Sequence, residues 1–325
     1  MVERTTRCHD LRGKVDFGIL TIREDEMEAV LQRFPAEFTI SSEQGHREYN
    51  LGEVGIPGSA ERYLIATTRC LDPGNIEAQA TASDMLRDLA PQWLLVVGIG
   101  GAVPDEECAL GDVVVSSRIY DLTVSAISRG RNEEFSIAGG TIHPAAGAKV
   151  ANLPAIRDQL GSWHDEASIG RPRPSVKIES DRLLGDVAWN KKVIAALSPL
   201  TEGRRPHPVA KVGHIAASDT LIKDIHRPKQ WLKVARKIQA FEMESAGVYR
   251  AAKSWRPEVP VVAIRGLSDV VGFKREGEWT AYACHTAAAF ALAFVRSRPI
   301  EPRSSAECER HGDAAPPSAG GTPSP

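Results

Sequence analysis

Short apolar runs alternate with helical patterns along most of this 325-residue chain, and this alternation restricts the folds it can adopt. Val15–Ile22 predicts a strand, and Glu24–Phe34 follows it with apolar side chains at helical spacing. Trp93–Val97 is continuously apolar and ends in glycines, as expected of a strand buried on both faces. Further strands are predicted at Arg62–Thr68, Val113–Ser116, Val212–Ala216, Lys237–Met243 and Val259–Arg265, and further helices at Asp181–Leu197, Ser245–Ser254, Glu278–Arg296 and from an Asn75 N-cap to about Leu89. The chain is therefore predicted to be an α/β protein with a mostly parallel, twisted central sheet flanked by helices.

Three stretches depart from this alternation. Residues 1–14 are polar and mixed in charge, which predicts a flexible N-terminus, and residues 298–325 are dominated by Pro, Ser, Gly and Ala, which predicts a disordered tail. One domain is expected over residues 15–297. Within it, residues 125–211 are expected to form an inserted excursion, either an addition to the sheet edge or a lid over the site. A long surface excursion with one docked helix is the alternative.

Charge and composition restrict the classes of molecule that the protein is expected to bind. The chain has 40 Lys and Arg against 42 Asp and Glu, a net charge of −2, so it lacks the basic excess of most nucleic-acid binders. Its longest apolar stretches are too short to span a bilayer, and its N-terminus lacks the apolar centre of a signal peptide. Five scattered cysteines without a C-x-x-C motif favour free thiols in a reducing compartment. We expect a cytoplasmic protein that binds neither nucleic acid nor membrane.

Common motifs for cofactors and nucleophiles are missing from the sequence. The segment VVGIGGAV has Val103 where a dinucleotide-binding fingerprint needs its third glycine. No phosphate-binding loop, G-x-S-x-G elbow or H-E-x-x-H pair occurs, and the histidines show no metal-ligand spacing. The sequence therefore predicts neither a cofactor nor a metal.

Two segments near the middle of the predicted sheet carry unusual residues. An acidic turn, Glu24–Glu26, follows the first predicted strand, where carboxylates also complement the positive end of a helix. The segment 96–103 ends a strand in a glycine turn, and Gly111-Asp112 opens the next strand. A structural turn at a sheet crossover explains the glycines equally well.

Two further segments place polar side chains at predicted strand ends, where parallel sheets bind ligands. In FEMESAG, Glu242 and Glu244 lie between a strand and a helix. Helix capping is one explanation, but carboxylates at such a position favour a bound partner. In VVAIRGLSDVVG, an apolar strand delivers Arg265, Ser268 and Asp269 together, and a structural Arg–Asp ion pair is the alternative.

Together, these segments resemble the nucleoside phosphorylase and nucleosidase superfamily, closest in pattern to the methylthioadenosine/S-adenosylhomocysteine nucleosidases. The resemblance covers about residues 15–124 and 209–297, and the ordered pair E-M-E-x-A and R-x-x-S-D is its most specific part. It implies a nucleoside phosphorylase-like three-layer fold and an enzyme that cleaves an N-glycosidic bond without a cofactor. A homo-oligomer is expected by analogy.

The resemblance assigns roles to the two strand-end motifs. Asp269 would be the general acid that protonates purine N7, which requires a raised pKa that burial supplies. Ser268 would orient Asp269, and Arg265 would position or tune it. Glu244 would bind the ribose hydroxyls, since a carboxylate accepts from two O–H groups, and Met243 would pack against the sugar.

The same resemblance extends to three other segments. Glu26 aligns with the glutamate that activates water in the nucleosidases. Leu221 would stack on the base, and Ile222 would contact it through its backbone. The glycine turn with Gly98 and Gly100 would lie near the sugar, although relatives often carry a hydroxyl residue where this chain has Gly98.

The resemblance favours hydrolysis over phosphorolysis. Phosphorylases hold phosphate with a Gly-Asp-Pro loop and arginines, whereas this chain has the acidic segment TIREDEMEAV, and Leu94 and Leu95 lie in the strand where purine phosphorylases carry a phosphate-binding arginine. A phosphate-dependent phosphorylase is the alternative enzyme. A non-catalytic nucleotide-sensing module is the alternative class, but such a module has no need for Glu26, Glu244 and Asp269 together.

The group at the substrate's 5′ end is left open by the sequence. The glycine turn resembles that of nucleosidase domains attached to defence proteins, and the chain carries arginines near the site or in the excursion. These are Arg69, Arg129, Arg131, Arg171 and Arg173. A phosphorylated adenine nucleotide is one hypothesis, and solvated surface arginines are the alternative.

Overall fold

The computed structural model describes residues 7–105, 107–126, 134–220, 222 and 224–303. The strands are β1 (Phe17–Thr21), β2 (Phe38–Ser41), β3 (Glu48–Gly55), β4 (Arg62–Arg69), β5 (Trp93–Ala102), β6 (Val113–Asp121), β7 (Ser125–Ala126), β8 (Glu134–Phe135), β9 (Ala138–Thr141), β10 (Ala210–Ala217), β11 (Ile238–Glu242) and β12 (Val261–Val270). The helices are α1 (Cys8–Leu11), α2 (Glu24–Leu31), α3 (Asn75–Asp88), α4 (Pro144–Ala151), α5 (Glu166–Ile169), α6 (Val187–Thr201), α7 (His226–Val234), α8 (Ser245–Ser254) and α9 (Gly277–Arg296), with short 3-10 turns η1 (Arg157–Leu160) and η2 (Ser180–Arg182).

One mixed sheet organises the described part of the chain, in the order β11-β10-β6-β12-β5-β1-β4-β3-β2 with β9 beside β6. Strands β4, β1, β5 and β12 run parallel, and so do β6, β10 and β11. Antiparallel pairing of β12 with β6 joins the two groups. The sheet also curls until β11 pairs with β5, so that it is partly closed.

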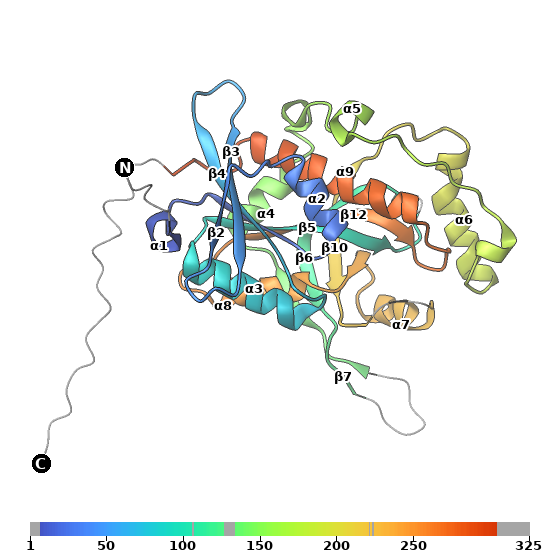
Figure 1. Ribbon diagram of the computed structural model, residues 1–325. Coiled ribbons are helices and arrows are strands. Elements are labelled where there is room, and N and C mark those ends of the chain that lie inside the picture. Colours follow the sequence, from blue (N-terminus) through green and yellow to red (C-terminus); the bar gives the residue numbers. More distant parts are fainter. Residues whose placement is uncertain (1–6, 106, 127–133, 221, 223, 304–325) are drawn as a thin grey trace, which may run out of the picture.

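Helices cover both faces of this sheet, as the α/β prediction requires. Figure 1 shows α2 and α9 on one side and α3 and α8 on the other, and each pair packs together. The predicted three-layer α/β fold is therefore confirmed. The hairpin of β2 and β3, which extends the edge beyond β4, was not predicted from the sequence.

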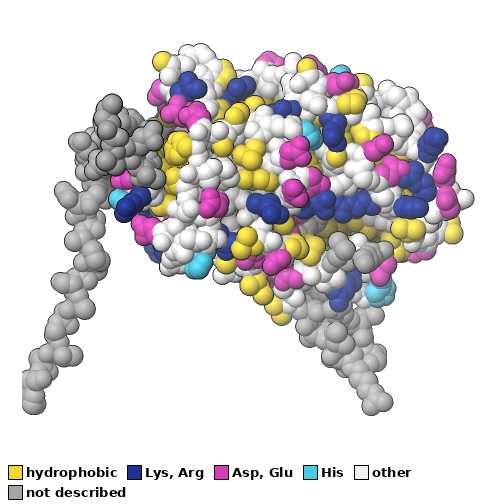
Figure 2. Space-filling view, in the orientation of Figure 1, with side chains coloured by type: hydrophobic (Ala, Val, Ile, Leu, Met, Phe, Trp, Pro, Cys, Tyr) yellow, Lys and Arg dark blue, Asp and Glu magenta, His cyan; other side chains and the backbone are white. Residues whose placement is uncertain are grey.

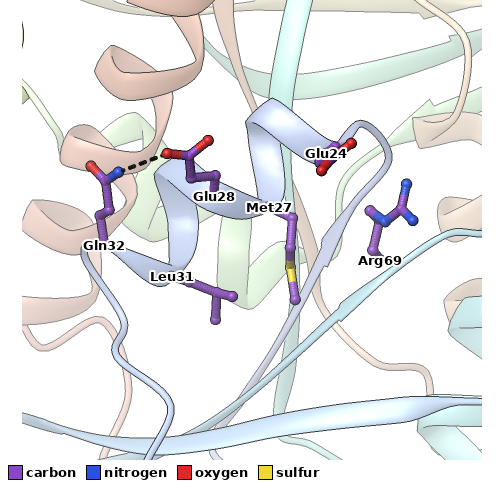
Figure 3. Close-up of a pocket in the computed structure, with 6 residues that line it drawn as sticks. All are labelled: Glu24, Met27, Glu28, Leu31, Gln32 and Arg69. Carbon is purple, nitrogen blue, oxygen red and sulfur yellow. Dashed lines mark hydrogen bonds between the residues drawn. The ribbon is translucent and has the colours of Figure 1, made fainter.

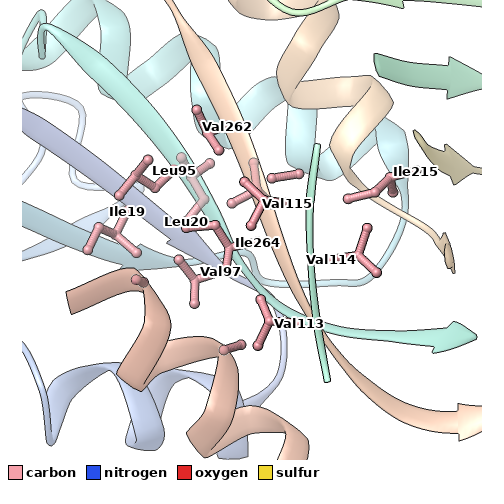
Figure 4. Close-up of a cluster of buried hydrophobic side chains, with 14 of the residues drawn as sticks. Ile19, Leu20, Leu95, Val97, Val113, Val114, Val115, Ile215, Val262 and Ile264 are labelled. Carbon is pink, nitrogen blue, oxygen red and sulfur yellow. The ribbon is translucent and has the colours of Figure 1, made fainter. Parts of the chain in front are cut away.

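The core lies between the sheet and its helices. Figure 4 shows buried aliphatic side chains from β1, β5, β6, β10 and β12, among them Ile19, Val97, Val115 and Ile264. Every residue of β1 is buried, which explains why the central strands read as continuous apolar runs.

Two strands continue beyond the apolar runs that predicted them. Strand β5 extends to Ala102 and β12 to Val270, so Gly98, Gly100 and Asp269 lie within the strands. At Gly100, an added Cβ would come within 3.0 Å of the Phe241 carbonyl oxygen. A glycine is needed there because β11 crosses close to β5. The N-cap of α3 is Gly74 and not Asn75, which is its first helical residue.

The excursion over residues 125–211 both extends the sheet and approaches its centre. Strand β9 pairs with β6, and α5 packs on α9. On α6, the Trp189 indole N–H donates to the Val271 carbonyl oxygen at 2.8 Å, just beyond β12. Leu184 donates its backbone N–H to Gly272 at 2.8 Å. The excursion is therefore anchored beside the end of the strand that carries Asp269.

The C-terminal end of the described chain packs beside β1 and β4. Tyr63 donates to the Ile300 carbonyl oxygen, and the Arg303 backbone N–H donates to Asp16 at 2.8 Å. Cys8 of α1 is buried. Most of the predicted tail, residues 304–325, lies outside the described residues. Among the described residues, no helix combines the length and apolar character needed to cross a membrane.

Candidate active site

Glu26 links the start of α2 to the glycine end of β5. It is 3% exposed, and its Oε2 accepts the backbone N–H groups of Ile22 and Arg23, both at 2.9 Å. Its Oε1 accepts the Ile99 N–H at 2.8 Å. The acidic turn is thus a helix cap, as its alternative interpretation held, and it also fixes one buried carboxylate against a central strand.

The E-M-E segment turns from β11 into α8 with both carboxylates buried. Glu242 accepts the backbone N–H groups of Glu244 and Ser245, each at 2.9 Å, and the Arg265 guanidinium at 2.5 Å. Glu244 accepts the Gly74 N–H at 3.4 Å and lies 3.6 Å from the same guanidinium. Glu242 is therefore a structural cap and ion-pair partner, whereas Glu244 is held more loosely.

Glu244 has a strongly perturbed acidity. Burial raises the pKa of its carboxyl group to about 8, and the neighbouring charge of Glu242 adds to the rise, whereas Arg265 opposes it. The carboxyl group is therefore largely protonated at neutral pH in the free protein. In this form it both donates and accepts hydrogen bonds.

The Arg265 side chain is fully buried next to the two glutamates of the E-M-E segment. Burial alone would lower the pKa of its guanidinium, but Glu242 and Glu244 raise it above the ordinary value. Its Nε and Nη1 have no hydrogen-bond partner within the described residues. At Gly98, an added Cβ would come within 2.5 Å of both Arg265 Nη1 and Glu26 Oε1. The glycine at this position therefore leaves space for an arginine and a carboxylate.

Ser268 and Asp269 end β12 as a hydrogen-bonded pair. The Ser268 hydroxyl donates to Asp269 Oδ1 at 2.6 Å, and Ser268 Oγ is 3.4 Å from the Gly100 carbonyl oxygen. The Asp269 side chain is 24% exposed, and the Arg275 guanidinium lies 3.8 Å from it. Asp269 is thus less buried than the sequence interpretation expected, because it faces the open part of a pocket.

A cavity of about 1010 Å³ collects these side chains. The predicted site residues that line it are Glu26, Gly100, Ile222, Met243, Glu244, Ser268 and Asp269. Gly98 and Arg265 are not among its lining residues and lie behind it, while Leu221 is outside the described residues. Figure 2 shows Lys and Arg side chains in a row across the middle of this face, between α2 and α7.

Several lining residues were not predicted, or were predicted only as candidates. Phe241 precedes the E-M-E motif and offers an aromatic surface, a signal that the sequence does contain. Arg275 lies in the loop after β12 and carried no signal. Arg69, one of the candidate arginines, ends β4 and lines the cavity. Of the excursion arginines, Arg171 and Arg173 are not among the lining residues, and residues 129 and 131 lie outside the described part.

A second cavity of about 450 Å³ adjoins the first along α2. Figure 3 shows Met27 and Leu31 pointing into it from the helix, with Arg69 beside Glu24 at one end. Glu24, Glu28 and Arg69 line both cavities. Arg69 therefore stands where the two spaces meet.

Comparison with known proteins places this arrangement in a family. Residues 16–296 match the family model of the phosphorylase superfamily. The ATP nucleosidase Cap17 of Escherichia coli (strain KTE188) is 24% identical over 201 residues, which are 60% of this chain and 34% of that protein. A death domain-containing ATP nucleosidase of Amphimedon queenslandica is 24% identical over 222 residues, 67% of this chain and 36% of its own length. The chain spans about a third of these relatives.

Solved structures share the fold. A Helicobacter pylori 5′-methylthioadenosine/S-adenosylhomocysteine nucleosidase superposes with a TM-score of 0.58 at 17% identity, covering 87% of this chain and 99% of that one. The futalosine hydrolase of Helicobacter pylori gives a TM-score of 0.58 at 16% identity, covering 87% and 97%. With the family model spanning most of the sequence, the resemblance inferred from the motifs is confirmed: the chain belongs to the phosphorylase superfamily.

Proposed function

We propose that this chain hydrolyses the N-glycosidic bond of a purine nucleoside or nucleotide, with adenine as the base. The observation that carries the proposal is the convergence of Glu26, Glu244 and Asp269 on one cavity. Glu26 lies against Gly98 and Asp269 against Gly101, three residues apart along β5, an offset of about 10 Å. The two carboxyl groups therefore approach different points of β5, as a base for water and an acid for the leaving group require.

Asp269 is the proposed acid. Departure of the base requires a proton on the purine ring, because an anionic purine is a poor leaving group. The Ser268 hydroxyl, 2.6 Å from Oδ1, fixes the carboxyl group, and the open side of Asp269 faces the cavity. Bound substrate displaces water from this side and brings the base within reach of the carboxyl group.

Glu26 is the proposed base for water. Three backbone N–H groups bind its oxygens, and a carboxylate has about four acceptor sites. One site therefore remains for a water proton. The rest of the acidic turn, Glu24 and Asp25, also lines the cavity and would repel a phosphate nucleophile, which supports hydrolysis over phosphorolysis.

The sugar and base are assigned to the β11 side of the cavity. Glu244 would bind the ribose hydroxyls and Met243 would pack beside them. Ile222 and Phe241 line the same cavity and would flank the base. Arg265, whose Nη2 lies 3.6 Å from Glu244 Oε2, would orient Glu244 from the side away from the cavity.

Arg69 is the proposed contact for a phosphorylated 5′ end. It lines the cavity and forms no ion pair with any described residue, so its charge is available to an anion. The relatives named as ATP nucleosidases support a nucleotide substrate. A charge-assisted hydrogen bond of this kind contributes about 1.5–3 kcal/mol, so Arg69→Ala is expected to raise KM for ATP tenfold or more.

The test is release of free base from adenosine, methylthioadenosine, S-adenosylhomocysteine, AMP and ATP, with and without phosphate. Adenine release without phosphate is expected. Release only with phosphate would make the protein a phosphorylase, and no release from any of them would contradict the proposal. Arg62→Ala is the matched control for Arg69→Ala, because Arg62 lies on the same strand but pairs with Glu53 at 2.9 Å.

A further inference from the structure

Three side chains with metal-binding groups meet far from the cavity. His164 and Asp165 precede α5, and His207 lies in the loop that leads into β10. His164 Nε2 is 3.6 Å and His207 Nδ1 is 4.0 Å from the same oxygen, Asp165 Oδ1. The two imidazole rings meet edge to face, with centroids 5.1 Å apart and planes at 69°. Two loops 42 residues apart in the sequence (207 − 165) thus present three donor atoms to one point.

The donors suit a divalent transition metal. Zinc binds imidazole nitrogen and carboxylate oxygen at about 2.0–2.2 Å, so that ligand atoms on a tetrahedral ion are about 3.3 Å apart. The observed separations need only a small contraction to reach this value. Two neutral imidazoles and one carboxylate form a set that is typical of zinc and its neighbours in the first transition row.

Both loops are held in place by contacts outside the cluster. Asp112, 1% exposed, accepts the Arg205 guanidinium at 2.7 Å and the Val209 backbone N–H at 2.9 Å. It therefore fixes the chain on both sides of His207. On the other loop, the Trp163 ring packs edge-on against Phe290 of α9, with centroids 5.1 Å apart. The donors are thus brought together before a metal binds.

An ordinary exposed His–Asp ion pair does not account for the second imidazole in this cluster. His9 and Asp10 form such a pair at 3.2 Å, with a comparably exposed imidazole. That pair has one imidazole, whereas Asp165 faces two. A metal ion accounts for the second imidazole, because each ring offers it one nitrogen ligand.

We propose that His164, Asp165 and His207 bind one Zn²⁺ ion per chain. The ion fastens the segment before α5 to the loop before β10, and so ties two distant parts of the excursion together. None of the three is among the lining residues of the larger cavity, so the site is structural and independent of the proposed hydrolysis. The fourth position is left for water.

The experiment uses the full chain without a histidine tag, stripped with a chelator and dialysed. Titration with ZnCl₂ by calorimetry, and metal content after desalting, should give one ion per chain. Saturating Zn²⁺ should raise Tm by several degrees. His207→Ala and His164→Ala should each weaken binding at least tenfold and abolish the Tm rise, while His9→Ala should behave as the wild type.

Equal zinc binding by the wild type, His164→Ala and His207→Ala would overturn the proposal, as would the absence of saturable binding at micromolar zinc. Loss of binding in His9→Ala would place the ion elsewhere and overturn it as well. Because 54% of the His207 side chain is accessible, His207→Ala should fold normally. A loss of zinc binding in this variant can then be distinguished from a folding defect. The metal-free variant should keep the Tm of the metal-free wild type.

Discussion

Two groups of carboxylates beside the cavity differ in how the protein balances their charge. The buried acidic cluster, Glu26, Glu242 and Glu244, surrounds the single guanidinium of Arg265, which is fully buried. Asp269 on the same strand as Arg265 has a neighbouring hydroxyl, a nearby arginine and access to solvent. Burial and neighbouring like charges dominate the surroundings of the first group. The surroundings of Asp269 depend on the molecule that occupies the cavity.

This comparison shows that the residue with the perturbed pKa need not be the residue that protonates the substrate. Burial beside Glu242 strongly raises the pKa of Glu244 in the free protein, although Glu244 is proposed to bind the sugar and Asp269 is the proposed acid. A perturbed pKa is therefore found at a residue proposed to bind substrate. The proposal of Asp269 as the acid rests on its place at the end of β12 with Ser268 beside it.

The largest expected effect is on turnover by Asp269→Asn. An amide cannot supply the proton that the leaving base requires, and general acid catalysis contributes about 10²–10⁴-fold. We expect kcat for base release to fall by that factor while Tm stays close to the wild type, since Asp269 is partly exposed. Glu278→Gln on the exposed first turn of α9 is the control. Undiminished turnover in Asp269→Asn would remove Asp269 from the chemistry.

The next effect is on stability and contrasts Arg265 with Arg275. Arg265→Met leaves buried carboxylates without their cation, which costs about 3–5 kcal/mol. Arg275→Met removes a half-exposed arginine at 3.8 Å from Asp269, and such pairs contribute at most about 1 kcal/mol. Urea unfolding of both variants measures the difference. Equal losses would show that the buried cluster does not depend on Arg265.

The fold was largely predictable because its central strands are buried on both faces. Runs such as Trp93–Val97 and Val261–Ile264 predict buried strands, and α9 follows the second of them. The β2–β3 hairpin escaped because Glu48–Gly55 carries polar and glycine residues at an exposed edge. The far end of β5 escaped because its glycines, needed where β11 and Arg265 approach, carry no strand signal.

The site was predictable where function lies at strand ends, and less so where it depends on tertiary contacts. Ser268 and Asp269 follow from an apolar run that ends in polar residues. The pairing of Glu242 with Arg265 joins β11 to β12, and no local pattern reveals it. The approach of His207 to His164 likewise depends on the path of the excursion.

A smaller effect concerns pH, through Glu244. Its pKa is about 8 in the folded protein against 4.5 for an ordinary glutamate, so folding takes up a proton between these values. Its contribution to stability is complete below about pH 4.5 and is lost as pH rises through 8. Tm of the wild type should therefore fall from pH 5.5 to 8.5 by more than Tm of Glu244→Gln. Parallel curves for the two proteins would contradict the raised pKa.

The smallest effect is expected for Ser268→Ala. The serine hydroxyl holds Asp269 through one hydrogen bond of 2.6 Å, and a hydrogen bond to a charged group contributes about 1.5–3 kcal/mol at most. Because Asp269 keeps its carboxyl group, kcat should fall about tenfold, far less than in Asp269→Asn, with KM nearly unchanged. Combining the two substitutions should cost little more than Asp269→Asn alone, since the serine acts only through the aspartate. Additive losses in the double variant would mean that Ser268 contacts the substrate itself.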